Sequence, residues 1–130
     1  MGTGYLVDTN IAIYTLNGAL PENAVRFLAP VLNAGCTISL ISRVELLGFA
    51  FADVADEDKV RQFVEDSVVL PLSDEVADQA IEIRKAHKIK LGDALIAATA
   101  LVNGLTLLTR NEADFKNIAG LHVVNPFMAS

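Results

Sequence analysis

Short apolar runs alternate along the chain with longer stretches in which apolar residues recur at helical spacing. The short runs predict strands at residues 5–7, 37–40, 68–72, 105–108 and 122–124. The longer stretches predict helices at 11–16, 22–33, 43–52, 56–65, from 73 into the basic run 84–90, and 91–102, with a loop or short helix at 111–115. Ser42 is the predicted N-cap of the helix 43–52. Strands that alternate with helices pair in parallel, so we predict an α/β fold of three layers, with a central parallel sheet flanked by helices.

The length and composition fit one globular domain over residues 1–130. Hydrophobic residues make up 52% of the chain, which excludes an intrinsically disordered protein. No apolar run reaches the roughly 18 residues of a membrane span, and the first residues lack the pattern of a signal peptide. The single cysteine, Cys36, excludes an intrachain disulfide. We therefore expect a cytoplasmic protein without membrane contact, with Cys36 as a small buried residue.

The chain carries a net charge of −6, which argues against a broad phosphate-binding surface, because such surfaces are built from Lys and Arg. The net charge does not describe a local site, however. Divalent cations that lie between carboxylates and a phosphate allow an acidic protein to act on phosphate esters.

Polar residues follow two of the predicted strands at the point where each strand ends. Asp8 comes directly after the first strand, and Thr109, Arg110 and Asn111 come directly after the fourth, with Asp114 three residues further on. Sites in open α/β sheets form beyond the carboxyl ends of the strands. These side chains are therefore expected at a functional site, although Asp8 alone is equally well explained as a helix N-cap and Asp114 as a turn residue.

Two further carboxylates occupy helical positions where apolar residues are expected. Glu45 falls on the apolar stripe of the predicted helix 43–52, and Asp93 is in line with Ile96 and Ala97 on the predicted helix 91–102. A carboxylate that faces a core destabilises the fold unless it is paired, capped or bound to a metal. Taken singly, Glu45 is explained by a pair with Arg43 or with another basic residue at the rim, and Asp93 by a capping role. Together with Asp8 and Asp114, they are expected to converge.

Other chemistries find less support in the sequence. His87 and His122 lack the spacing of a zinc site, and we expect His87 to be a solvated residue of the basic run. The chain has no Gly-x-Ser-x-Gly elbow, no Walker-type loop and no dinucleotide fingerprint after its first strand. An oxygen-only site remains, which suits Mg²⁺ or Mn²⁺.

Four segments and the chain's end resemble, in order and spacing, the PIN domains of VapC toxins, the ribonucleases of type II toxin–antitoxin pairs: Asp8-Thr9-Asn10, Glu45 in its helix, Asp93-Ala-Leu-Ile-Ala-Ala-Thr-Ala, Thr109-Arg-Asn-Glu-Ala-Asp114-Phe115 and Leu121-His-Val-Val-Asn-Pro126. The resemblance covers essentially the whole chain. It implies a parallel sheet between helices and an endoribonuclease that depends on Mg²⁺ or Mn²⁺. It also implies an antitoxin partner and a homodimer.

The resemblance assigns roles residue by residue. The acidic quartet of the family maps onto Asp8, Glu45, Asp93 and Asp114, while Thr9, Thr109 and Asn111 match auxiliary polar positions. We expect Asp8 to bridge two metal ions, Glu45 and Asp93 to complete the first, and Asp114 with Asn111 to hold the second ion or a bound water. Residues expected to contact RNA are Arg43, Arg110 and the run Arg84–Lys90, which is otherwise explained as a solvated helix end.

Two alternatives belong to other functional classes. The chain is either a nuclease or a non-catalytic PIN-fold module that binds RNA or protein, and the four acidic residues favour the nuclease. A phosphohydrolase of small phosphate esters commonly begins with Asp-x-Asp, whereas Asn10 occupies the third position here.

The segment Leu46–Phe51 carries more apolar side chains than one buried stripe can hide. We therefore predict that Phe49 or Phe51 lies at an interface, either with the antitoxin or with a second subunit. Full burial of both side chains within one isolated chain would contradict this prediction.

Overall fold

The structure, a computed structural model, describes residues 4–130 and contains five short strands. These strands are β1 (Tyr5–Val7), β2 (Thr37–Ser39), β3 (Val68–Leu70), β4 (Thr106–Leu108) and β5 (Val123–Val124). The helices are α1 (Thr9–Leu16), α2 (Glu22–Asn33), α3 (Leu40–Leu47), α4 (Val54–Glu65), α5 (Asp74–Ala86), α6 (Leu91–Val102), α7 (Glu112–Phe115) and the 3₁₀ helix η1 (Pro126–Met128). The order confirms the predicted alternation of strands and helices.

All strand pairs are parallel. One sheet has the order β1-β4-β5, a second pairs β2 with β3, and β1 packs beside β2. The chain therefore moves outward from β1 on one side through β2 and β3, and on the other side through β4 and β5. The strand order reverses at β1, where open α/β sheets place their ligand sites. β3 lies at an edge, as Pro71 directly after Leu70 predicted.

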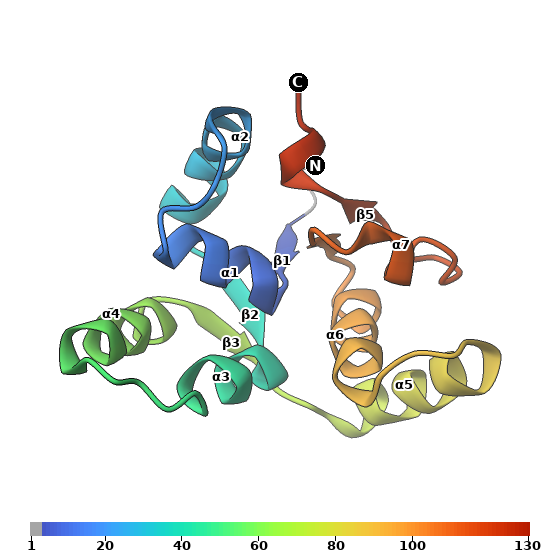
Figure 1. Ribbon diagram of the computed structural model, residues 1–130. Coiled ribbons are helices and arrows are strands. Elements are labelled where there is room, and N and C mark those ends of the chain that lie inside the picture. Colours follow the sequence, from blue (N-terminus) through green and yellow to red (C-terminus); the bar gives the residue numbers. More distant parts are fainter. Residues whose placement is uncertain (1–3) are drawn as a thin grey trace.

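Helices cover both faces of the strands. Leu6 and Leu107 are fully buried against α5, α6 and α7, whereas Val7 and Leu108 are buried against α1, α2 and α4. Neighbouring residues of a strand point to opposite faces, so each strand contributes to both cores. Figure 1 shows the two groups of helices, α1 to α4 on the left and α5 to α7 on the right, with the strands between them. The predicted three-layer α/β fold is confirmed.

The helix α3 begins three residues earlier than predicted. Ser39 is its N-cap and accepts a hydrogen bond from the backbone N–H of Ser42, so the predicted cap at Ser42 is wrong. The helix ends at Leu47, five residues before the predicted end at 52. Sequence reasoning chose the second of two serines because both are good caps and the apolar Leu40 continued the strand pattern.

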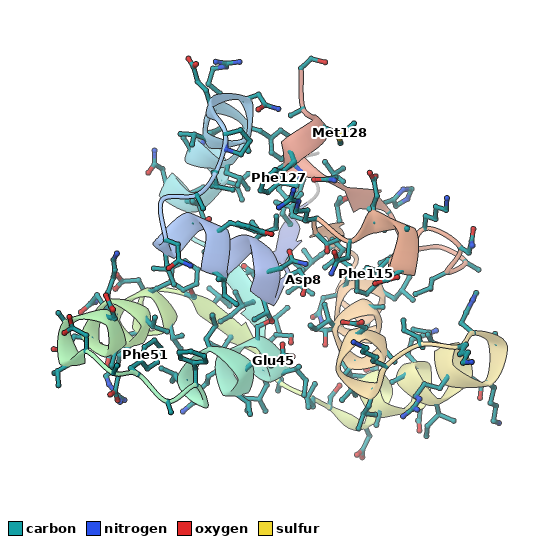
Figure 2. All side chains as sticks on the ribbon, viewed as in Figure 1. Asp8, Glu45, Phe51, Phe115, Phe127 and Met128 are labelled. Carbon is teal, nitrogen blue, oxygen red and sulfur yellow. The ribbon has the colours of Figure 1, made fainter. Side chains whose placement is uncertain are left out.

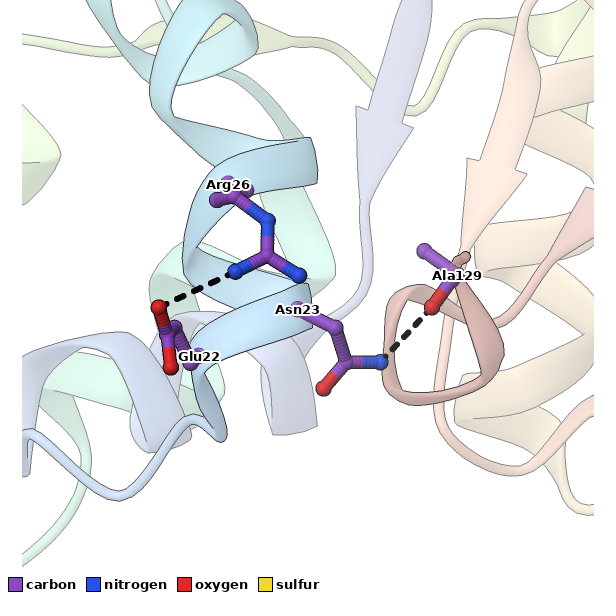
Figure 3. A network of polar contacts seen from close by, with 4 residues as sticks. All are labelled: Glu22, Asn23, Arg26 and Ala129. Atoms are coloured by element: carbon purple, nitrogen blue, oxygen red, sulfur yellow. Dashed lines mark hydrogen bonds and ion pairs between the residues drawn. The ribbon is translucent and has the colours of Figure 1, made fainter.

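The C-terminal segment is tied back onto α2. The side-chain amide of Asn23 donates to the carbonyl oxygens of Phe127 and Ala129, both at 2.9 Å. Figure 3 shows the bond to Ala129 beside the Arg26–Glu22 ion pair of 3.1 Å. Both side chains of that ion pair are exposed, so the pair adds little to stability. The bonds from Asn23 to the backbone therefore hold this end of the chain more firmly than the ion pair does.

Within residues 4–130, no helix has both the length and the apolarity needed to cross a membrane. Cys36 precedes β2 and is only 6% exposed, which confirms it as a buried residue. Burial raises the pKa of its thiol to about 11.

We expect the Cys36 thiol to be unreactive in the native protein. The thiolate is the nucleophile, and burial both disfavours ionisation and blocks access. At pH 8, a chromogenic disulfide reagent should react with one thiol per chain in denaturant and with almost none in its absence. Rapid reaction of the native protein would contradict the placement of Cys36 in the core.

Candidate active site

Asp8 lies at the point where the strand order reverses, and the residue is 4% exposed. Its backbone N–H continues the β1–β4 ladder by donating to the carbonyl of Leu108 at 2.9 Å. Its side chain caps α1, with Oδ1 accepting from the N–H of Thr9 at 2.7 Å. Asp8 therefore has the capping role considered from the sequence, but Oδ2 is bonded elsewhere, at the end of β4.

Thr109 and Asn10 complete the surroundings of Asp8. The fully buried Thr109 hydroxyl donates to Asp8 Oδ2 at 2.7 Å and accepts from the N–H of Asn111 at 3.1 Å. The amide of Asn10 donates to both Asp8 Oδ2 and Thr109 Oγ1 at 3.3 Å, and its oxygen accepts from the N–H of Arg110. These bonds join the carboxyl ends of β1 and β4 around one carboxylate.

Glu45 reaches this centre from α3 through a hydroxyl. Thr9 Oγ1 donates to Glu45 Oε1 at 2.5 Å and is hydrogen-bonded to Ser42 Oγ at 2.8 Å. Figure 2 shows Asp8 and Glu45 near the middle of the molecule, where α1, α3 and α6 come together. Glu45 Oε2 also lies beside α6, because a Cβ atom placed on Gly92 would be 3.7 Å from it.

The expectation that Glu45 sits on a core-facing stripe is wrong. The helix α3 packs with Ser42 and Leu46 inward, while Glu45 is exposed and its neighbour Val44 is 60% exposed. Thr9, rather than Arg43, is the hydrogen-bond partner of Glu45. Glu45 thus reaches the site from the rim of the fold instead of from its core.

Asp93 and Asp114 lie on the other side of the centre. Asp93 is half-buried in the first turn of α6, whose N-cap is Lys90, so Asp93 is not the cap of this helix. Asp114 is exposed on α7. Both side chains line a cavity of about 320 Å³ between α7 and the loop that joins α5 to α6.

Burial and mutual repulsion shift the protonation of two of these carboxylates. Burial raises the pKa of Asp8 to about 6, against the hydrogen bonds from Thr109 and Thr9 and with the help of the negative charges of Asp93 and Glu45. Burial also raises the pKa of Asp93, helped by Asp114 and Glu45 and opposed by Lys90. The four carboxylates therefore share one electrostatic environment, although they come from four different helices or helix ends.

The four carboxylates do not converge as closely as the sequence led us to expect. Among residues 4–130, no three Asp, Glu, His or Cys side chains gather tightly enough to form a metal-binding group. Repulsion between uncompensated carboxylates favours such separated side-chain positions. The chemistry of the donor set still fits a hard divalent cation, since all its groups are oxygens and the electrostatic coupling runs from Glu45 through Asp8 and Asp93 to Asp114.

The remaining residues expected at the site, Asn111, Arg43 and Arg110, do not contact the carboxylate of Asp8 with their side chains. Asn111 is exposed, and its backbone N–H rather than its side chain bonds Thr109. Arg43 is exposed on α3. The Arg110 guanidinium donates to Tyr14 Oη at 2.6 Å and lies 4.3 Å from the Phe127 ring centroid. Arg110 therefore fastens the C-terminal segment to α1, a role that the sequence did not predict.

Sequence reasoning missed Asn10 and Ser42 as members of the site. Asn10 carried a usable signal, because it follows Asp8 by two residues in the first turn of a helix that starts at a strand end. Ser42 carried none, since its role depends on where α3 begins. His87, expected to be solvated, is half-buried in the wall of the cavity that Asp93 also lines.

Comparison with known proteins agrees with this geometry. The sequence profile of the PIN domain matches residues 5–121. The chain therefore belongs to the PIN domain family, as its resemblance to that family predicted. No curated sequence gives a significant match.

Solved structures with similar folds include toxin–antitoxin assemblies. A toxin–antitoxin complex from Klebsiella pneumoniae has 32% identity and a TM-score of 0.74 over 95% of this chain and 98% of that one. VapBC2 from Rickettsia felis, bound to a promoter DNA fragment, has 26% identity and a TM-score of 0.79, covering 93% and 97%. FitAcB from Neisseria gonorrhoeae has 26% identity and a TM-score of 0.79, covering 95% and 99%. The predicted likeness to VapC-type PIN domains is confirmed.

The raised pKa of Asp8 predicts how stability depends on pH in metal-free protein. Between the unfolded value of about 3.8 and the native value of about 6, the native state binds more protons than the unfolded state. The free energy of unfolding should therefore fall as pH rises through this window, by about 3 kcal/mol from this group in all, of which about 2 kcal/mol falls between pH 4.5 and pH 7.5. Urea unfolding in a chelator at pH 4.5 and pH 7.5 measures the fall.

Asp8→Asn should show a smaller fall than the parent, because the substituted side chain does not titrate. Asp78→Asn, an equivalent change on exposed α5, is the control and should keep the parent's dependence. An identical dependence in parent and Asp8→Asn would show that Asp8 is not the group that titrates.

Proposed function

We propose that this protein is the toxin of a toxin–antitoxin pair and hydrolyses RNA through Mg²⁺ or Mn²⁺ held by Asp8, Glu45, Asp93 and Asp114. The observation that carries the proposal is the buried carboxylate of Asp8 at the switch point, flanked by Glu45 and Asp93. Carboxylates that raise one another's pKa destabilise the fold when they are ionised, unless a cation compensates them. Membership of the PIN family and the VapBC neighbours support the same function.

The chain's own residues orient the acidic groups before any ligand arrives. The N–H of Thr9 and the hydroxyl of Thr109 hold the two oxygens of Asp8. The hydroxyl of Thr9 holds one oxygen of Glu45 and leaves the other, Oε2, beside α6. Such supporting hydrogen bonds fix ligand orientation in metal sites.

A bound divalent ion would supply an activated water and would neutralise charge on the phosphate and the leaving oxygen. Asp8, Glu45 and Asp93 are suited to hold such an ion from the protein side. Asp114, exposed in the wall of the cavity, is suited to hold a second ion or an ordered water near the substrate.

Cleavage should depend both on the metal and on the acidic residues. Purified protein, freed of antitoxin, should cleave structured RNA in Mg²⁺ or Mn²⁺ and not in EDTA. Asp93→Asn should lower the rate by more than the roughly 10–100-fold typical of removing a partner of a metal ligand. Gel analysis of end-labelled RNA measures both effects.

Asp78→Asn again serves as the control, because it removes one charge on α5 away from the site. Cleavage that persists undiminished in EDTA or in Asp93→Asn would contradict a carboxylate-bound metal site. Absence of cleavage of any RNA, together with intact binding of a partner, would support the alternative of a non-catalytic binding module.

An apolar surface beside Glu45 supports an antitoxin partner. Phe49 is 67% exposed, and Phe51 packs edge-to-face on it with ring centroids 5.2 Å apart. A cavity of about 180 Å³ there is lined by apolar side chains of α1, α3 and α4 and by Glu45 itself. A protein segment seated here would cover the aromatic pair and reach the acidic site, so we assign this surface to the antitoxin. The homodimer and the cytoplasmic location stay predictions.

Phe49→Ser should weaken antitoxin binding by about 30-fold, as expected for an interface residue worth roughly 2 kcal/mol, and leave RNA cleavage by free toxin unchanged. Met128→Ser changes another exposed apolar residue, one that lies far from Phe51 in Figure 2, and should have no effect. Titration calorimetry measures the affinity. Equal affinity of both variants and the parent would remove Phe49 from the antitoxin interface.

A further inference from the structure

The cavity between the α5–α6 loop and α7 combines groups that the acidic centre lacks. Its lining includes His87, Lys88 and Lys90 from the loop, Asn117 after α7, and the carboxylates of Asp93 and Asp114. We propose that this cavity is the subsite for one nucleotide of the RNA, adjacent to the phosphate that is cleaved. This inference rests on the proposed function and adds where the substrate is gripped.

The cations of this acidic protein are unevenly placed. Residues 84–90 contain four of the ten Lys and Arg residues and no Asp or Glu. Lys85 pairs with Glu82 on α5, and with Arg84 it borders a different, apolar surface. Lys88 and Lys90 instead line the cavity, so the part of the basic run nearest the acidic centre is the part that faces it.

The cavity has the size and the mixed lining that a nucleotide requires. Its volume of about 320 Å³ is at the lower end of the range for small-ligand pockets. Ile89, Ala113 and Ile118 supply apolar surface, and the His87 ring supplies a flat face on which an unstacked base can lie. The Asn117 amide offers a donor and an acceptor to a base edge.

The charged groups of the cavity have two different functions in this arrangement. The lysines attract a phosphate, whereas Asp93 and Asp114 repel any anion unless a cation lies between. An RNA strand would satisfy both conditions, since one phosphate would contact the lysines and the next would approach the carboxylates with a cation between them. An acidic protein segment would pair with the lysines, but it would leave the apolar surface around Ala113 and Ile118 without a planar group to cover it.

The test measures binding of a labelled single-stranded oligoribonucleotide to full-length Asp8→Asn protein in Mg²⁺, at several salt concentrations. Adding Lys88→Gln and Lys90→Gln should weaken binding by about tenfold for each lysine, as for a hydrogen bond to a charged group. The slope of log K against log salt should become shallower by about 0.7 for each phosphate that the variant no longer neutralises.

Two comparisons make the test specific. Ala113→Leu places bulk in the cavity without changing charge, so it should weaken binding and leave the salt slope unchanged. Lys59→Gln with Arg61→Gln removes the same charge from exposed positions on α4 and should leave both quantities close to the parent's.

Several results would overturn the subsite. They are an effect of equal size in the α4 pair, no effect of Ala113→Leu, or lysine variants that lose affinity for antitoxin but not for RNA. Cleavage by the chain with Asp8 intact is measured in parallel. If the lysine variants retain cleavage and bind RNA as well as the parent does, the subsite alone is overturned. If the parent itself neither cleaves nor binds RNA, the proposed function is overturned as well.

Discussion

The buried carboxylate of Asp8 sets the conditions that the surrounding structure has to meet. Burying an ionised group is costly unless hydrogen bonds and neighbouring charges compensate it. The cap contact with Thr9 and the hydroxyl of Thr109 provide part of this compensation, and the pKa of Asp8 still rises to about 6. Because Asp8 follows β1 and Thr109 follows β4, the pairing of these strands and the position of the carboxylate depend on each other.

The packing of β1 and β4 explains how strands of only two or three residues can position the residues of a site. β1 sends Leu6 into one core and Val7 into the other, so its end is fixed from both faces of the sheet. Thr109 continues the ladder by donating its N–H to Val124 of β5. The polar groups at this edge are thus held in place by strands that pack into both cores. Glu45 and Asp114 are themselves exposed.

The sequence predicts the parts of the site that depend on strand ends and misses those that depend on helix phase. Asp8 and Thr109 follow apolar runs directly, and parallel pairing brings such positions to one edge. Glu45 was placed on a buried stripe because the apolar Ile41 and Val44 share its side of the predicted helix, whereas α3 buries another side. The partnership of Thr9 with Glu45 and Ser42 joins residues more than thirty positions apart, and only the packing of α1 on α3 reveals it.

A net charge of −6 would oppose the approach of the proposed RNA substrate, yet the distribution of charge reduces this conflict. Negative charge that faces the site is concentrated in four carboxylates, where a divalent cation reverses its effect on an anion. Four of the ten Lys and Arg residues lie at the end of α5 and in the loop before α6, whose first turn carries Asp93. Lys90 and Asp93 stand three residues apart, so in the proposed function attraction for the RNA and affinity for the metal would be built on one helix end. The excess of negative charge elsewhere would disfavour binding of a polyanion away from the few basic side chains.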